Sequence, residues 1–194
     1  MRISVKKLTL MAVLAAVALI VFIIEAQIPL PVLVPGMKLG LANAVTLFAL
    51  FYSGGKANAA ENSKTESEPG NEADSGVDGK VGLTAVNAFT ILLCRIILGA
   101  VFTGRLIAFA YSITGGLLGF FAQVVTKRFI SHKQIWVCGA VGAVFHNIGQ
   151  ILTAVIITGT PAVAAYLPVL IIAGVVTGVL TGLVAQFTLE RISK

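Results

Sequence analysis

The chain has 194 residues, of which 57% are hydrophobic and only 11% are charged. A soluble domain carries about 25% charged residues, so this composition excludes an ordinary soluble protein and predicts an integral membrane protein. The formal charge of +6 does not indicate a nucleic-acid partner, because the basic residues stand at the ends of apolar segments, as membrane topology requires.

Six apolar segments predict an all-α fold with six transmembrane helices, in a single transmembrane domain that covers residues 1–194. Each segment is close to the ~20 apolar residues that a helix needs to cross a bilayer. The predicted spans run from Leu8 to Ile28, Met37 to Ser53, Leu83 to Phe102, Leu106 to Val125, Ile135 to Thr158 and Ala162 to Phe187. The second span is the shortest, and its start in the stretch Pro35 to Gly40 favours a broken or re-entrant beginning.

The segment from Gly54 to Gly82 differs in kind from the rest of the chain. It holds six of the eight acidic residues and no aromatic residue. Such a segment cannot bury enough apolar surface to offset the entropy lost on ordering, so we expect a disordered cytoplasmic loop that acts as a solvated spacer. A regulatory role for this loop is the alternative.

The distribution of lysine and arginine predicts the orientation. With the N-terminus inside, eleven basic residues are cytoplasmic, Lys38 and Arg105 are outside, and Arg95 lies within a span. This bias predicts a multi-pass protein of the cytoplasmic membrane with both termini on the cytoplasmic side.

The fifth predicted span carries three strongly polar side chains within five residues. His146 and Gln150 are four residues apart and share a helix face, with Asn147 next to it. Neutral imidazole and carboxamide groups donate and accept hydrogen bonds, so this cluster predicts a site for a polar heterocycle, a proton or an ion. The alternative is a hydrogen-bonded clamp between helices.

Arg95 lies in the middle of the third span, where a guanidinium group needs a carboxylate partner or an anionic ligand. Glu25 is the only carboxylate within a predicted span, so a structural Glu25–Arg95 pair is the alternative to a ligand site. Lys38 and Asn43 form a second polar spot near the outer face, suited to phosphate or carboxylate, unless Lys38 simply extends to the membrane interface. The predicted substrate-binding residues are therefore Lys38, Asn43, Arg95, His146, Asn147 and Gln150.

Two further observations concern catalysis and partners. The chain has no ATP-binding loop motif and no carboxylate cluster near a span, which magnesium chemistry on a diphosphate needs, so we expect no catalysis, no metal and no resident cofactor. Ala12 and Ala16 in the first span form a pair of small residues that lets another helix approach closely. That helix belongs either to the same bundle or to a partner protein.

Four motifs stand out along the chain, namely Val34 to Asn43, Cys94 to Gly99, Gly115 to Leu118 and His146 to Gln150. Together they resemble the Gx transporter family, whose members are widely labelled heptaprenyl diphosphate synthase component I. The resemblance extends over nearly the whole chain and departs from the family at the long acidic loop, where the family has a short connection.

The hydrophobic layout of that family is similar to the substrate-binding S components of energy-coupling factor (ECF) transporters. The resemblance implies an S-component-like bundle, a lid over the substrate at Ile28 to Lys38, and partner docking through Ala12 and Ala16. It implies transport of a small vitamin-like molecule, first of all a flavin, with ECF-type energising subunits or an Rnf-type redox complex as partners. The family label implies an alternative function, a membrane accessory subunit of heptaprenyl diphosphate synthase in isoprenoid quinone biosynthesis. A third class is a purely structural membrane subunit of a redox complex.

Overall fold

The computed structural model describes residues 5–27, 38–52 and 82–192, and the structural statements below concern these residues. The predicted disordered loop at 54–82 lies outside them except for Gly82, and the lid implied at Ile28 to Lys38 lies outside them except for Lys38.

All regular structure in the described residues is helical. The α-helices are α1 (Val5–Glu25), α2 (Asn43–Phe51), α4 (Ala85–Thr103), α5 (Leu106–Lys127), α6 (Ile135–Thr158) and α7 (Leu167–Ile192), with short 3-10 helices at His132–Gln134 and Pro161–Tyr166. Five segments are long and apolar enough to cross a membrane, namely α1, α4, α5, α6 and the continuous stretch Pro161–Ile192. The all-α prediction is confirmed, and five of the six predicted spans have a matching helix.

The second predicted span is not confirmed as a membrane-crossing helix. At 1.5 Å per residue, the nine residues of α2 reach about 14 Å, less than half of the ~30 Å hydrocarbon core. Residues 38–42 precede α2 without helical structure, and Gly40 has a φ of 82°, a conformation that favours glycine. The broken beginning expected at this place is therefore present, but the count of six membrane-spanning helices is not reached in the described residues.

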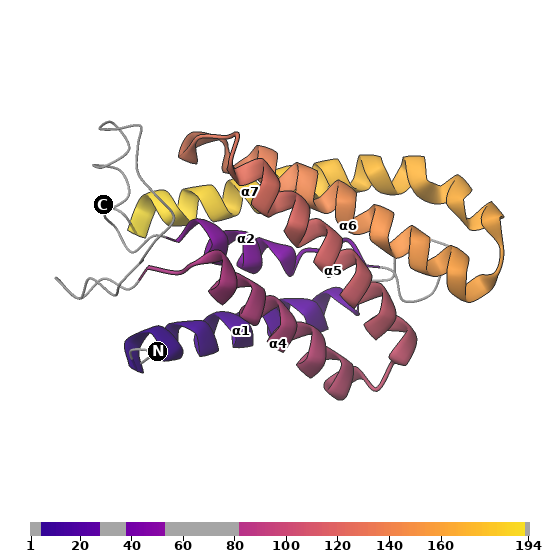
Figure 1. Ribbon diagram of the computed structural model, residues 1–194, viewed down its shortest axis with the longest axis horizontal. Helices are drawn as coiled ribbons and strands as arrows, with labels where there is room; N and C mark the ends of the chain where they lie inside the picture. Colours follow the sequence, from indigo (N-terminus) through magenta and orange to yellow (C-terminus); the bar gives the residue numbers. More distant parts are fainter. Residues whose placement is uncertain (1–4, 28–37, 53–81, 193–194) are drawn as a thin grey trace.

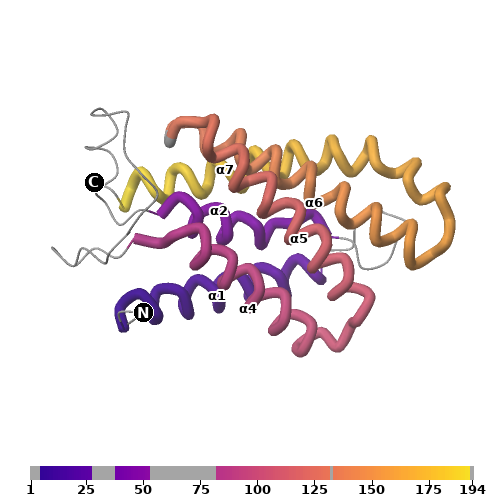
Figure 2. Tube along the Cα trace, in the orientation of Figure 1, coloured from indigo at the N-terminus to yellow at the C-terminus, as the bar shows by residue number. Residues whose placement is uncertain are grey.

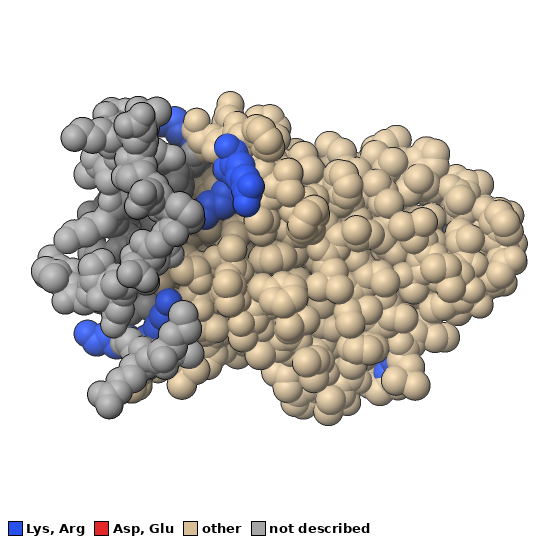
Figure 3. Space-filling model, in the orientation of Figure 1, with Lys and Arg blue, Asp and Glu red and all other residues tan. Residues whose placement is uncertain are grey.

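The helices run back and forth along the long axis of the molecule (Figure 1). α1 begins and α7 ends at the same end, whereas the turns from α4 to α5 and from α6 to α7 lie toward the opposite end, as the trace in Figure 2 also shows. On the face shown in Figure 3, lysine and arginine side chains gather mainly at the end where α1 begins. That distribution is the one a positive-inside topology requires, and the orientation in the membrane stays a prediction.

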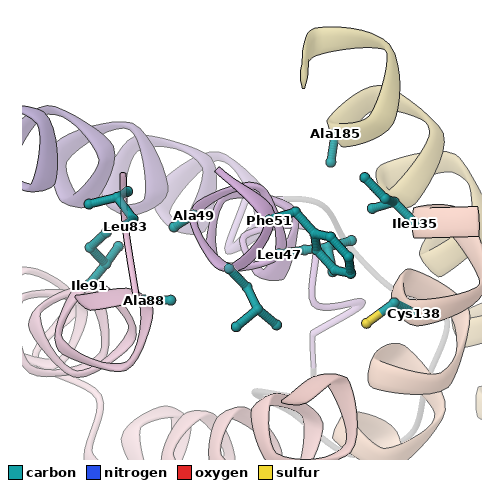
Figure 4. Close-up of a cluster of buried hydrophobic side chains, with 10 residues drawn as sticks. Leu47, Ala49, Phe51, Leu83, Ala88, Ile91, Ile135, Cys138 and Ala185 are labelled. Atoms are coloured by element: carbon teal, nitrogen blue, oxygen red, sulfur yellow. The ribbon is translucent and has the colours of Figure 1, made fainter. Parts of the chain in front are cut away.

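The short helix α2 is held in the centre of the bundle. Its side chains Leu47, Leu50 and Phe51 are at most 3% exposed, and they belong to a cluster that also contains residues of α4, α6 and α7. Figure 4 shows members of this cluster converging from these helices. Irregular backbone is tolerated at membrane depth only where protein covers it, so burial of α2 explains how the chain accommodates the non-helical stretch 38–42.

Close backbone approach joins α6 to both of its main neighbours, α5 and α7. A Cβ atom at Gly178 of α7 would lie 2.6 Å from the carbonyl oxygen of Gly139. Similarly, a Cβ atom at Gly149 would lie 2.8 Å from the Cα of Gly115 in α5. No real Cβ atom fits at such distances, so these glycines permit helix packing by van der Waals contact, as small residues do in membranes.

Candidate functional site

All six predicted substrate-binding residues are buried, and five of them, all except Asn147, come together near the start of α2. Lys38 is 7% and Asn43 8% exposed, and the other four are 3% exposed or less. They are supplied by the stretch that leads into α2, by α2 itself, by α4 and by α6. We refer to Glu25, Lys38, Asn43, Arg95, His146 and Gln150 as the polar cluster.

Two side chains hold the non-helical stretch 38–42 against the bundle. A carboxylate oxygen of Glu25, the last residue of α1, accepts hydrogen bonds from the backbone N–H groups of Gly40 and Leu41, the latter at 3.2 Å. The side-chain oxygen of Gln150 in α6 accepts a hydrogen bond from the backbone N–H of Lys38 at 3.3 Å. These bonds connect α1 and α6 through one short stretch of backbone.

Arg95 contacts the first residue of α2. Its Nη2 donates a hydrogen bond to the side-chain oxygen of Asn43 at 3.1 Å, while its Nε has no hydrogen-bond partner in the described part of the chain. Glu25 and Arg95 interact electrostatically but form no direct ion pair within residues 5–27, 38–52 and 82–192. Glu25 and Arg95 therefore do not form the direct structural pair that was the alternative to a ligand site. Each of them instead forms hydrogen bonds with uncharged groups.

Lys38 turns inward instead of extending to the membrane interface. Its ammonium nitrogen lies over the ring of Phe22, 3.0 Å from the ring centroid, and has no hydrogen-bond partner among the described residues. A cation over an aromatic face gains about 2 kcal/mol or more when both are desolvated. Phe22 was not among the residues predicted from the sequence, although it lies three residues before Glu25 on the same face of α1.

His146 and Gln150 contact each other, as their spacing predicted. The Nε2 atoms of the two side chains are 2.9 Å apart. Glycines on two sides make room for the imidazole: a Cβ atom at Gly115 would lie 2.9 Å from its Nδ1, and one at Gly40 would lie 3.1 Å from its Cδ2. The ring is therefore enclosed between α5 and the stretch that leads into α2.

Asn147 has a different role from its two neighbours. Its side-chain nitrogen donates a hydrogen bond to the backbone oxygen of Leu170 at 2.6 Å, which fastens α6 to the first turn of α7. This contact is the interhelical clamp considered as the alternative for the fifth span. The side-chain oxygen of Asn147 has no hydrogen-bond partner in the described residues.

The predicted docking pair lies elsewhere. Ala12 and Ala16 are on the exposed face of α1, together with Val13 and Val17, whereas Ala18 on the opposite face is fully buried. The pair is therefore not used for helix packing within the described residues.

The fold is that of a multi-pass helical membrane protein with a charged polar cluster enclosed inside its bundle. A sequence model of the family described as heptaprenyl diphosphate synthase component I matches residues 14–60 and 80–188. The chain belongs to this family, which confirms the resemblance carried by the four sequence motifs. Searches of curated proteins and of solved structures gave no match.

Proposed function

We propose that the protein is a membrane transporter of S-component type that moves a small vitamin-like molecule, a flavin in the first place, across the cytoplasmic membrane. The observation that supports this proposal is the polar cluster itself. Charged and strongly polar side chains are costly inside a membrane bundle and mark substrate pathways when they occur there. Here six such residues converge on one place, and Arg95 and Lys38 keep polar atoms without hydrogen-bond partners among the described residues.

The chemistry of the cluster suits a planar heterocycle with several hydrogen-bonding edges. Carboxamide and imidazole groups of Asn43, His146 and Gln150 offer both donors and acceptors, and Arg95 and Lys38 add donors only. In the described arrangement Gln150 bonds the backbone of Lys38 and Asn43 bonds Arg95. Ligand binding would exchange these internal bonds for bonds to the ligand, which requires the stretch 38–42 to shift. In this proposal the protein acts by binding and translocation and performs no catalysis.

Coupling to an energy source is proposed to occur through α1. Ala12 and Ala16 are small, exposed and separated by one helical turn, so a helix of a partner protein can approach closely there. ECF-type energising subunits are the partner class that this proposal names, with an Rnf-type redox complex as the destination of an exported flavin.

A second candidate function is favoured by the description of the family. In that case the chain is the membrane accessory subunit, component I, of heptaprenyl diphosphate synthase, and its partner is a synthase component. A third class, a structural membrane subunit of a redox complex, would use the polar cluster only to hold helices together.

The visible absorbance of the full chain purified in detergent tests the first proposal. A bound yellow chromophore, or saturable uptake of added riboflavin, supports a flavin transporter. A matched control is available in Gln123, a buried glutamine of α5 outside the polar cluster. Gln150→Leu is expected to reduce riboflavin binding, and Gln123→Leu is not. A chain that binds no flavin and copurifies with a prenyl synthase would instead support the accessory subunit.

A further inference from the structure

The polar cluster contains an unequal number of buried charges. Lys38 and Arg95 are cations and Glu25 is the anion, and each is at most 7% exposed. The three groups interact electrostatically with one another. One positive charge therefore remains without a buried counter-charge among the described residues, in a place where low dielectric makes an uncompensated charge costly.

Within residues 5–27, 38–52 and 82–192, no other acidic side chain lies at the polar cluster. Six of the eight acidic residues belong to the segment 54–82, and the residues 28–37 contain none. Glu190 is in the last turn of α7 and bonds Gln186. The described residues that flank 53–81 are Tyr52 and Gly82, and the backbone N–H of Leu83 donates a hydrogen bond to the backbone oxygen of Tyr52 beyond the C-terminal end of α2, whereas the polar cluster is at the N-terminal end of α2.

The hydrogen-bonding state of the three charged groups agrees with the charge count. One oxygen of the Glu25 carboxylate, Oε1, accepts hydrogen bonds from the backbone N–H groups of both Gly40 and Leu41. In contrast, Arg95 Nε and Lys38 Nζ have no hydrogen-bond acceptor in the described residues, and Lys38 has only the ring face of Phe22. Lys38 Nζ and Arg95 Nε thus remain available as donors, whereas one oxygen of the anion already accepts two hydrogen bonds.

We infer that the ligand of the polar cluster carries an anionic group of the phosphate class, which Lys38 and Arg95 hold as donors. The inference rests on the proposed function only in so far as the cluster is a ligand site, and it names the chemistry that this site selects. Guanidinium and ammonium groups bind phosphate through charge-assisted hydrogen bonds. The same chemistry is offered by a phosphorylated soluble heterocycle and by a prenyl diphosphate, and these two sources are separated by experiment.

Two pairs of probes test the inference on the full chain, purified in an uncharged detergent and a phosphate-free buffer. Riboflavin is compared with riboflavin 5′-phosphate, and farnesol with farnesyl diphosphate, by equilibrium binding. The phosphorylated member of at least one pair is expected to bind about tenfold more tightly or better, which corresponds to about 1.4 kcal/mol. Tighter binding of riboflavin 5′-phosphate than of riboflavin would identify the ligand as a phosphorylated soluble heterocycle. Tighter binding of farnesyl diphosphate than of farnesol would identify it as a prenyl diphosphate.

Charge variants then connect the preference to the two cations. Lys38→Gln and Arg95→Gln should abolish most of the preference for the phosphorylated probe, whereas Glu25→Gln, which keeps an acceptor for Gly40 and Leu41, should increase it. Arg128→Gln is the control, because it removes a positive charge from an exposed residue at the C-terminal end of α5. If Arg95→Gln fails to fold, Lys38→Gln alone is used for the test. That variant is expected to fold, because the Lys38 ammonium makes no hydrogen bond within the described residues.

The outcomes separate the inference from the proposed function. Equal affinity for both members of each pair, or no binding of either phosphorylated probe, overturns the inference. Tight riboflavin binding without a preference for riboflavin 5′-phosphate would overturn the inference but would still support the proposed flavin transporter. Binding of farnesyl diphosphate but of neither flavin supports the anionic ligand and removes the flavin from the proposed function.

Discussion

Gln150 accepts a hydrogen bond from the backbone N–H of Lys38, which lies 112 residues earlier in the chain. The same carboxamide contacts His146 through its nitrogen. One side chain of α6 therefore both holds the stretch that leads into α2 and orients the imidazole of the polar cluster. This double contact makes Gln150 the most informative residue to change.

Gln150→Leu is expected to lower both stability and ligand affinity. Leucine has a similar volume but leaves the buried N–H of Lys38 and the His146 nitrogen unpaired, which costs about 1–3 kcal/mol of the free energy of unfolding. Loss of hydrogen bonds to the ligand should weaken binding by a similar amount, about 1–3 kcal/mol. Thermal melting in detergent and a riboflavin titration well below the midpoint measure the two effects separately. Unchanged ligand affinity in folded Gln150→Leu, together with a destabilised Arg95→Leu, would mean that the cluster is a structural polar core.

The main features of the fold follow from hydropathy, because length and apolar composition are what a bilayer selects. Hydropathy does not report the path of the backbone, so the second span was expected to be longer than the nine residues of α2. The residues before α2 remain apolar enough to prolong the span, yet Gly40 with its positive φ keeps them from continuing the helix.

The membership of the polar cluster was predictable for the same physical reason, since each polar side chain in a span stands out against hydrocarbon. The partners of these residues were not predictable. Whether Arg95 meets Glu25 or Asn43 depends on how distant helices are aligned, and no local pattern in the sequence records that alignment. Phe22 was missed because a phenylalanine inside an apolar helix looks like an ordinary lipid-facing or core residue.

Ala16→Phe on α1 is expected to block docking of a partner while leaving the protein stable. Ala16 is exposed, so a larger side chain can extend away from the bundle. Ala18→Phe is the matched control, because Ala18 is fully buried and overpacking typically costs about 1–3 kcal/mol. Co-purification with coexpressed ECF-type energising subunits measures docking, and thermal melting measures stability. A clear fall in the melting midpoint of Ala16→Phe would show that Ala16 packs within the bundle instead.

The topology prediction is tested by tags. Reporters placed at both termini and at Asn71 should all be cytoplasmic, because eleven of the basic residues lie in segments assigned to that side. Deletion of Asn58 to Gly79 should leave membrane insertion and the melting midpoint unchanged, since no apolar surface is expected to depend on that segment. An externally accessible Asn71 would overturn the topology, and loss of folded protein on deletion would overturn the spacer interpretation.

Gly40→Ala should damage the polar cluster, and the chain offers a close control in Gly159→Ala. Both glycines have positive φ, 82° for Gly40 and 63° for Gly159, so alanine introduces backbone strain of about 1–2 kcal/mol at either position. The surroundings differ: a Cβ atom at Gly159 meets nothing within 4 Å, whereas one at Gly40 would lie 3.1 Å from both the Asn43 side-chain nitrogen and the His146 ring.

The alanine methyl group at position 40 would therefore displace two residues of the cluster and strain the backbone held by Glu25. We expect Gly40→Ala to lower the melting midpoint more than Gly159→Ala does, and to weaken ligand binding, which Gly159→Ala should leave unchanged. Titration of the same ligand into both variants at a temperature where each is folded measures the difference. Equal affinities in the two variants would place the ligand away from Gly40 and His146. The affinity of a ligand bound there should change when a methyl group is added between Asn43 and the imidazole.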